Sequence, residues 1–181
     1  MVRRKYIQNL VEGLLSNFSV SENNGPINVK EIAESMGVHV QSSDTKDNVS
    51  GFLYRDTNTG AVIGVNSDQN ENRQRFTIAH ELGHFLLHEG EPFFIDDNFF
   101  KINLRDNKSS KGSDTIEIEA NYFAAELLMP RLILEKKLES IKNIDVINDE
   151  ENSPLSEIAT SLGVSKQALT YRLANLGYIS L

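Results

Sequence analysis

The chain has 181 residues with a formal net charge of −8, and 39% of its residues are apolar. This ordinary globular composition supports one compact domain, or one domain with a small appendage. The absence of cysteine excludes disulfide scaffolds, thiolate zinc sites and cysteine nucleophiles. The negative charge argues against a surface built mainly to hold nucleic acid. No apolar run approaches the roughly 18 residues that span a bilayer, and the N-terminus lacks a signal-peptide pattern. We therefore expect a cytoplasmic protein without a membrane partner, in which any metal site uses histidine and carboxylate.

Periodic apolar residues predict the elements of the first half of the chain. Apolar side chains spaced i, i+3, i+4 predict a helix over about 3–17. Asn28 is placed to cap a short helix that Gly37 ends, with Glu31 as its capping-box partner. The further elements expected here are a brief strand at 38–40, a hairpin of strands 49–55 and 61–66, and a helix over about 73–88.

The second half of the chain alternates polar stretches with helical patterns. Residues 105–114 are polar and turn-prone, which indicates a loop, and a helix over about 115–128 follows. Pro130 opens a further helix, and the tail has the pattern of helix, glycine turn, helix. We therefore expect a main domain at 1–142, an acidic linker at 143–154 and a helix-turn-helix-like module at 155–181.

Residues 80–84 form an H-E-x-x-H motif. On a helix, side chains four residues apart leave one face, separated by about 40° in azimuth and about 6 Å in rise. His80 and His84 can therefore meet one Zn²⁺ at about 2.0–2.1 Å each. Glu81 projects beside them and can accept the proton of the attacking water, so the motif predicts one zinc per chain in a hydrolytic site.

A catalytic zinc usually takes a third protein ligand. His88 continues the series of histidines, but it lies about 12 Å along the axis from His80, too far for one ion on a straight helix. We expect it at the surface or behind the ligands. The longer H-E-x-x-H-x-x-G-x-x-H signature is excluded, because Leu87 and Gly90 stand where it requires glycine and histidine.

A carboxylate on the helix after the polar loop remains as the third ligand. Glu117 and Asn121 share one helix face, so Glu117 could bind zinc while Asn121 hydrogen-bonds a ligating histidine from behind. Glu119 lies about 200° around the helix from Glu117 and should face elsewhere. The alternative is that Glu117 completes a capping box with Asp114.

Two sequence blocks together resemble the signature of the ImmA/IrrE family of zinc metallopeptidases. They are RQRFTIAHELGHFLLH at 73–88 and EIEANYFAAELLMP at 117–130, within a similarity that covers about 49–131. The resemblance implies a gluzincin-like core with His80, His84 and Glu117 as zinc ligands. It also implies Glu81 as the catalytic carboxylate.

The family resemblance further implies a function, namely cleavage of a helix-turn-helix repressor of a phage or mobile element, which relieves repression. Two alternatives stay open: a zinc-bound regulatory protein that binds a repressor or DNA without cutting, and a toxin-like member of a two-gene module. The tail carries only Glu157, Lys166 and Arg172, a net charge of +1 (two basic minus one acidic). This favours a packing or substrate-recognition role for the module over DNA contact.

The expected fold is α+β, with a small twisted antiparallel sheet packed on the helix at 73–88. Helices at 3–17 and 115–128 would complete the core. We expect substrate to bind in an extended conformation beside a sheet edge, at the strand 61–66. The sequence does not indicate the oligomeric state.

Overall fold

The computed structural model describes residues 1–18, 25–43, 49–56, 60–88, 93–96, 111–139 and 153–180, the segments 93–96 and 111–114 by their backbone. The fold is α+β, as predicted. Its elements are α1 (Arg4–Asn17), α2 (Val29–Ser35), β1 (Val38–Ser43), β2 (Gly51–Asp56), β3 (Gly60–Asn66), α3 (Glu71–Leu87), β4 (Phe93–Asp96), α4 (Lys111–Leu128), α5 (Arg131–Glu139), α6 (Pro154–Leu162) and α7 (Lys166–Asn175).

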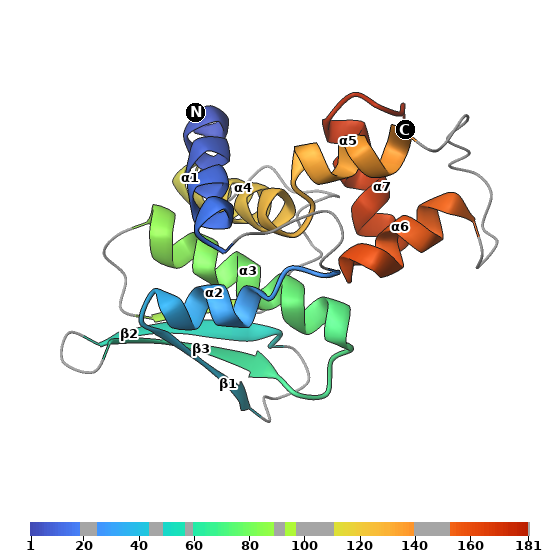
Figure 1. The fold of residues 1–181 in the computed structure, drawn as a ribbon. Coiled ribbons are helices and arrows are strands. Elements are labelled where there is room, and N and C mark those ends of the chain that lie inside the picture. Colours follow the sequence, from blue (N-terminus) through green and yellow to red (C-terminus); the bar gives the residue numbers. More distant parts are fainter. Residues whose placement is uncertain are drawn as a thin grey trace.

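The elements are arranged in layers around α3 (Figure 1). The sheet lies on one side, α2 and α3 cover it, and α1 and α4 form the next layer. α3 contacts α4 on one side and β2 and β3 on the other. A helix in this position must be buried nearly all round, and every residue from Thr77 to His84 is buried.

The sheet is mixed, with the strand order β1-β3-β2-β4, and this corrects the predicted antiparallel sheet. The hairpin is confirmed, because β2 pairs antiparallel with β3. β1 joins the far side of β3 and pairs with it in parallel, Val38 opposite Ala61. The chain reverses direction between β1 and β2 and again between β2 and β3, so β1 and β3 run the same way.

The predicted edge strand is also wrong, because β3 is paired on both sides, with β1 and with β2. Its backbone donors and acceptors are used in two ladders and cannot pair with an extended peptide. The edges of the described sheet are β1 and β4.

Local capping explains several element boundaries. The Asn28 side chain accepts a hydrogen bond from the backbone N–H of Glu31 at 3.2 Å, as predicted for the start of α2. Gly37 follows this helix with φ +78°, a conformation that glycine adopts without strain. The start of α4 differs from the prediction: it begins at Lys111, inside the predicted loop. Asp114 therefore lies within the helix, and the capping-box alternative for Glu117 is wrong.

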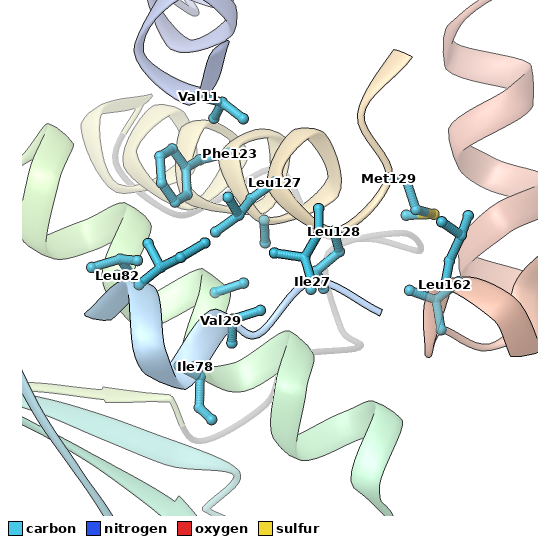
Figure 2. Close-up of a cluster of buried hydrophobic side chains, with 14 of the residues drawn as sticks. Val11, Ile27, Val29, Ile78, Leu82, Phe123, Leu127, Leu128, Met129 and Leu162 are labelled. Carbon is cyan, nitrogen blue, oxygen red and sulfur yellow. The ribbon is translucent and has the colours of Figure 1, made fainter. Parts of the chain in front are cut away.

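The C-terminal helices share the hydrophobic core with the rest of the chain. Leu155, Ile158, Leu162, Leu169 and Leu173 belong to the same buried cluster as side chains of α1 to α4. Figure 2 shows the side of this cluster where Met129, directly after the end of α4, faces Leu162 of α6. Residues 140–152, which contain most of the predicted linker, lie outside the described residues. The separation into two domains stays a prediction.

Polar contacts also attach the C-terminal helices to the core. Nη2 of Arg172 on α7 lies 2.8 Å from Oε1 of Glu126 on α4, and both side chains are buried. Arg75 of α3 donates to the carbonyl oxygens of Leu162 and Gly163, where α6 ends. Because Arg172 is buried, it cannot contact DNA or another external partner. Lys166 is the other basic residue of the tail.

No helix within the described part of the chain is long and apolar enough to cross a bilayer.

Candidate metal centre

The helix α3 carries the H-E-x-x-H motif through the middle of the molecule. The Asn70 side chain caps it by accepting from the backbone N–H of Arg73 at 3.0 Å. Gly51 of β2 admits the helix closely, because a β-carbon there would lie 2.3 Å from Cγ2 of Thr77. The turn of α3 that contains Thr77 therefore packs directly on β2. The opposite face of α3 packs on α4.

Gly83, inside the motif, allows α3 and α4 to approach. A β-carbon at this position would lie 3.2 Å from Cα of Ala120 and 3.1 Å from Cδ1 of Phe123, both on α4. Such contacts are tighter than most in folded proteins, so a side chain at position 83 would require α4 to move by a few tenths of an ångström. This approach brings the first described turns of α4 to the two motif histidines.

Three donor groups meet between these helices. Nε2 of His80 and Nε2 of His84 are 2.9 Å apart. Glu117 places Oε2 3.4 Å from His80 Nε2 and Oε1 3.3 Å from His84 Nε2. Donors at tetrahedral angles around Zn²⁺, with bonds of about 2.0–2.1 Å, are separated by roughly 3.3 Å. The two histidine–glutamate distances match this spacing, and the shorter histidine pair needs a small side-chain adjustment.

Among the described residues, these three form the one group of three or more such side chains that could hold a metal ion. The histidine side chains are 1% and 2% exposed, whereas Glu117 is 34% exposed. The donor set is therefore closed on the histidine side and reached from solvent beside Glu117. A catalytic zinc keeps one coordination position for water or substrate, and solvent access beside Glu117 would allow either to reach it.

The protonation of the cluster favours metal binding. Burial lowers the pKa of His80 to about 4, although hydrogen bonds to Glu117 and Asn121 oppose this shift. Burial alone would raise the pKa of Glu117, but the two imidazoles outweigh it and hold this pKa well below its usual range. At neutral pH the site therefore presents a neutral His80 and an ionised carboxylate, which are the forms that bind metal.

Glu81 is 1% exposed on the same helix. Arg55 of β2 is near enough for the Glu81 carboxylate to oppose the lowering of the Arg55 pKa that burial causes. Arg55 also donates to the carbonyl oxygens of His84 and His88, at 2.6 and 2.8 Å. A buried carboxylate beside a metal-donor set, with a cation in its vicinity, is suited to accept and return a proton.

The structure brings together most of the residues that the sequence singled out. His80, His84 and Glu117 converge, and Asn121 hydrogen-bonds His80. Glu119 is not one of the three donors, and its carboxylate contacts Arg3 and His88 instead.

Sequence reasoning placed His88 at the surface or behind the ligands, but it missed the contact of Arg3 with Glu119 behind the cluster. Glu119 accepts hydrogen bonds from the Arg3 side chain at 2.6 to 3.1 Å and from the Arg3 backbone N–H at 2.8 Å. His88 lies between Glu119 and His84. The spacing of four residues between His84 and His88 is a local signal for this contact. Nothing local could indicate Arg3, which is 116 residues from its partner.

An α+β fold with an H-E-x-x-H helix, a glutamate on a neighbouring helix and a buried carboxylate between the histidines defines a class of protein, the metallopeptidases. Comparison with known proteins identifies the family. The family profile described as the IrrE N-terminal-like domain, Peptidase_M78, matches residues 33–174, and the chain belongs to this family. It is a metallopeptidase, as predicted.

Individual relatives agree with this assignment. The chain is 28% identical over 162 residues to "Metallopeptidase ImmA" of Bacillus subtilis, covering 90% of this chain and 84% of that protein. It is 29% identical to "Uncharacterized immunity region protein 2" of Bacillus phage phi105, covering 60% of this chain and 63% of the relative. It is also 29% identical to "Radiation response metalloprotease IrrE" of Deinococcus deserti, covering 81% of this chain and 52% of that relative.

A solved structure confirms the fold alone. The structure of a "Mycobacterium tuberculosis transcriptional regulator" matches with a TM-score of 0.63 at 18% identity. The match covers 94% of this chain and 46% of that one.

Proposed function

We propose that this chain is a zinc-dependent endopeptidase with a gluzincin-like site that cleaves a helix-turn-helix repressor and so relieves repression. The observation that carries the catalytic part is the convergence of three donor atoms within 4.8 Å of one another, beside a buried Glu81. The substrate class is supported by the family and by relatives whose names include ImmA and a phage immunity region protein. One zinc per chain would be held by His80, His84 and Glu117.

The donor set favours zinc over harder or softer metals. Two imidazoles and one carboxylate, without thiolate, make up the ligand set of many hydrolytic zinc sites. Zinc in such a site supplies polarisation of the substrate carbonyl and a lowered pKa for water.

The residues of the chain supply the proton transfers. Glu81 accepts the proton of the attacking water and returns it to the leaving amide nitrogen, so the carboxylate is regenerated at the end of the cycle. Its burial excludes bulk water from this transfer, and the Arg55 guanidinium lies near enough to interact electrostatically with its carboxylate. Substrate would reach the site beside Glu117, whose side chain is the most exposed of the three proposed ligands.

The alternatives are a regulatory protein that holds zinc and binds its partner without cutting, and a toxin-like partner in a two-gene module. A carboxylate buried between two metal-binding histidines favours the peptidase, because a structural site needs no base. In a protein that only binds its partner, the fold would be the same but Glu81 would transfer no proton.

The substitution Glu81→Gln separates these functions. The amide keeps the volume and can hydrogen-bond, but it cannot accept a proton, so cleavage of a helix-turn-helix repressor substrate should fall about 10²–10⁴-fold. Zinc content, measured by elemental analysis, should match the parent. Glu12→Gln, at an exposed position of α1, is the matched control and should cleave normally. Relief of repression in cells by Glu81→Gln at the parent level would establish binding, rather than proteolysis, as the function.

A further inference from the structure

The side chain of His88 is enclosed between a proposed zinc ligand and a carboxylate. It is 8% exposed. Its Nδ1 lies 3.3 Å from Nδ1 of His84, and its Nε2 lies 3.2 Å from Oε2 of Glu119. Each ring nitrogen of His88 therefore has a partner, and the direction of the hydrogen bond between the two histidines depends on which nitrogen of His88 carries the proton.

Glu119 selects that direction. An ionised carboxylate only accepts, so the proton of a neutral His88 belongs on Nε2, where it is donated to Glu119. Nδ1 of His88 is then an acceptor, and the facing Nδ1 of His84 must donate. His84 consequently keeps its lone pair on Nε2, which is the atom that lies near His80 and Glu117. The opposite arrangement would place two acceptors 3.2 Å apart at Glu119.

Arg3 holds Glu119 in place. Its guanidinium donates to both carboxylate oxygens and, through Nη2, to the carbonyl oxygen of Leu87 at 3.0 Å. The residue just before α1 is thereby tied both to α4 and to the last turn of α3. A carboxylate anchored by a two-point arginine contact has little freedom to rotate away from His88.

We propose that His88, held by Glu119 and Arg3, is a positioning residue that fixes His84 with its proton on Nδ1 and its lone pair on Nε2 toward the metal. This inference rests on the proposed ligand set, because it requires His84 to bind through Nε2. Groups that orient a ligating histidine from behind raise metal affinity about 10- to 100-fold.

The first test observes the proton directly. In zinc-loaded protein labelled with ¹⁵N at histidine, long-range ¹H–¹⁵N correlation spectra distinguish the two tautomers, and the chain has only 4 histidines to assign. We expect the His88 proton on Nε2 and the His84 proton on Nδ1. A His88 proton on Nδ1 would overturn the inference, and no substitution is needed to see it.

The second test measures zinc affinity by competition with a chromophoric chelator. His88→Phe keeps the ring volume without hydrogen bonds and should weaken binding about 10- to 100-fold. His88→Gln offers an acceptor to His84 and a donor to Glu119, so it should retain most of the affinity. His39→Phe, at an exposed position on β1, is the control and should bind as the parent does. A folded His88→Phe variant with parental affinity would contradict the positioning role.

His84→Ala distinguishes the two levels of failure. If this variant keeps full zinc occupancy, the ligand set is wrong and the inference fails with it. If His84→Ala loses zinc while His88→Phe binds as tightly as the parent, the proposed function stands and only the positioning role fails.

Discussion

At Gly83, a β-carbon would lie 3.2 Å from Cα of Ala120 and 3.3 Å from its carbonyl oxygen. These are backbone atoms of α4 and cannot rotate away as a side chain would. The residue between Glu81 and His84 therefore sets the distance between the helix of the histidines and the helix of Glu117.

We expect Gly83→Ala to weaken zinc binding, because α4 must shift by some tenths of an ångström and carry Glu117 with it. Overpacking costs about 1–3 kcal/mol, which should outweigh the roughly 1 kcal/mol that alanine gains in a helix. Urea unfolding and chelator competition measure both effects. Gly13→Ala on α1, where a β-carbon meets nothing within 4 Å, is the control and should be stabilising. Equal stabilisation by both substitutions, with unchanged zinc affinity, would refute the close-approach argument.

The ionisation of Glu119 makes the free energy of unfolding depend on pH in the acid range. The hydrogen bonds from Arg3 lower the pKa of Glu119 from 4.5 to about 2. Because the folded state binds this proton more weakly than the unfolded state, the interaction stabilises the fold fully above pH 4.5 and is lost as the pH falls toward about 2.

We therefore expect the free energy of unfolding to fall less steeply below pH 4.5 in Glu119→Gln than in the parent. Urea unfolding at a series of pH values measures this slope, in the presence of a chelator so that metal binding does not contribute. Glu12→Gln, at an exposed site, should leave the slope unchanged. Identical slopes for the parent and Glu119→Gln would show that the Arg3 contact does not stabilise the fold.

At the scale of elements, α7 is joined to α4 by a charged pair within the core. Arg172 lies 2.8 Å from Glu126, donates to the carbonyl oxygen of Met129 and stacks over Tyr122. Both partners are buried, so removing one leaves the other charge without its counterion in a low-dielectric environment.

Arg172→Met should destabilise the protein by about 3–5 kcal/mol, whereas the double variant Arg172→Met with Glu126→Leu should recover much of this loss. Urea unfolding of the parent, both single variants and the double variant completes the cycle. Arg131→Met breaks an exposed pair with Glu135 and should barely move the urea midpoint. If the double variant is as unstable as the sum of the single ones, the cost lies in packing rather than in the unpaired charge.

At the scale of the whole molecule, the C-terminal helices share one hydrophobic cluster with the rest of the chain. Leu134 of α5 is fully buried, and Leu162 and Leu173 join it in the same cluster. A chain ending at residue 142 would expose the surface that these helices cover, at roughly 25 cal/mol per Å² of apolar area.

We expect this truncated chain to unfold at a lower temperature and to bind a hydrophobic dye more strongly than the full chain. Circular dichroism melting and dye fluorescence measure the two effects. A truncated chain with an unchanged melting temperature would support the separate domain at 1–142 that the sequence predicts.

The sequence by itself determined the features that depend on short windows of chain. The limits of α1 and α3, the cap at Asn28, the hairpin of β2 and β3 and the H-E-x-x-H motif follow from spacings of a few residues. The family assignment follows from two such blocks. These predictions are confirmed because helix and strand periodicities are set by local geometry.

Only the tertiary structure decided which distant residues meet. The pairing of β1 with β3, the contact of Arg3 with Glu119 and the burial of Arg172 join segments that are far apart in the chain. Their physical basis is the packing of α3 between the sheet and α4, which brings Glu117 to the histidines through Gly83. Such contacts carry no periodic signal in the chain, because they depend on the shapes and charges of surfaces that exist only after the elements have formed.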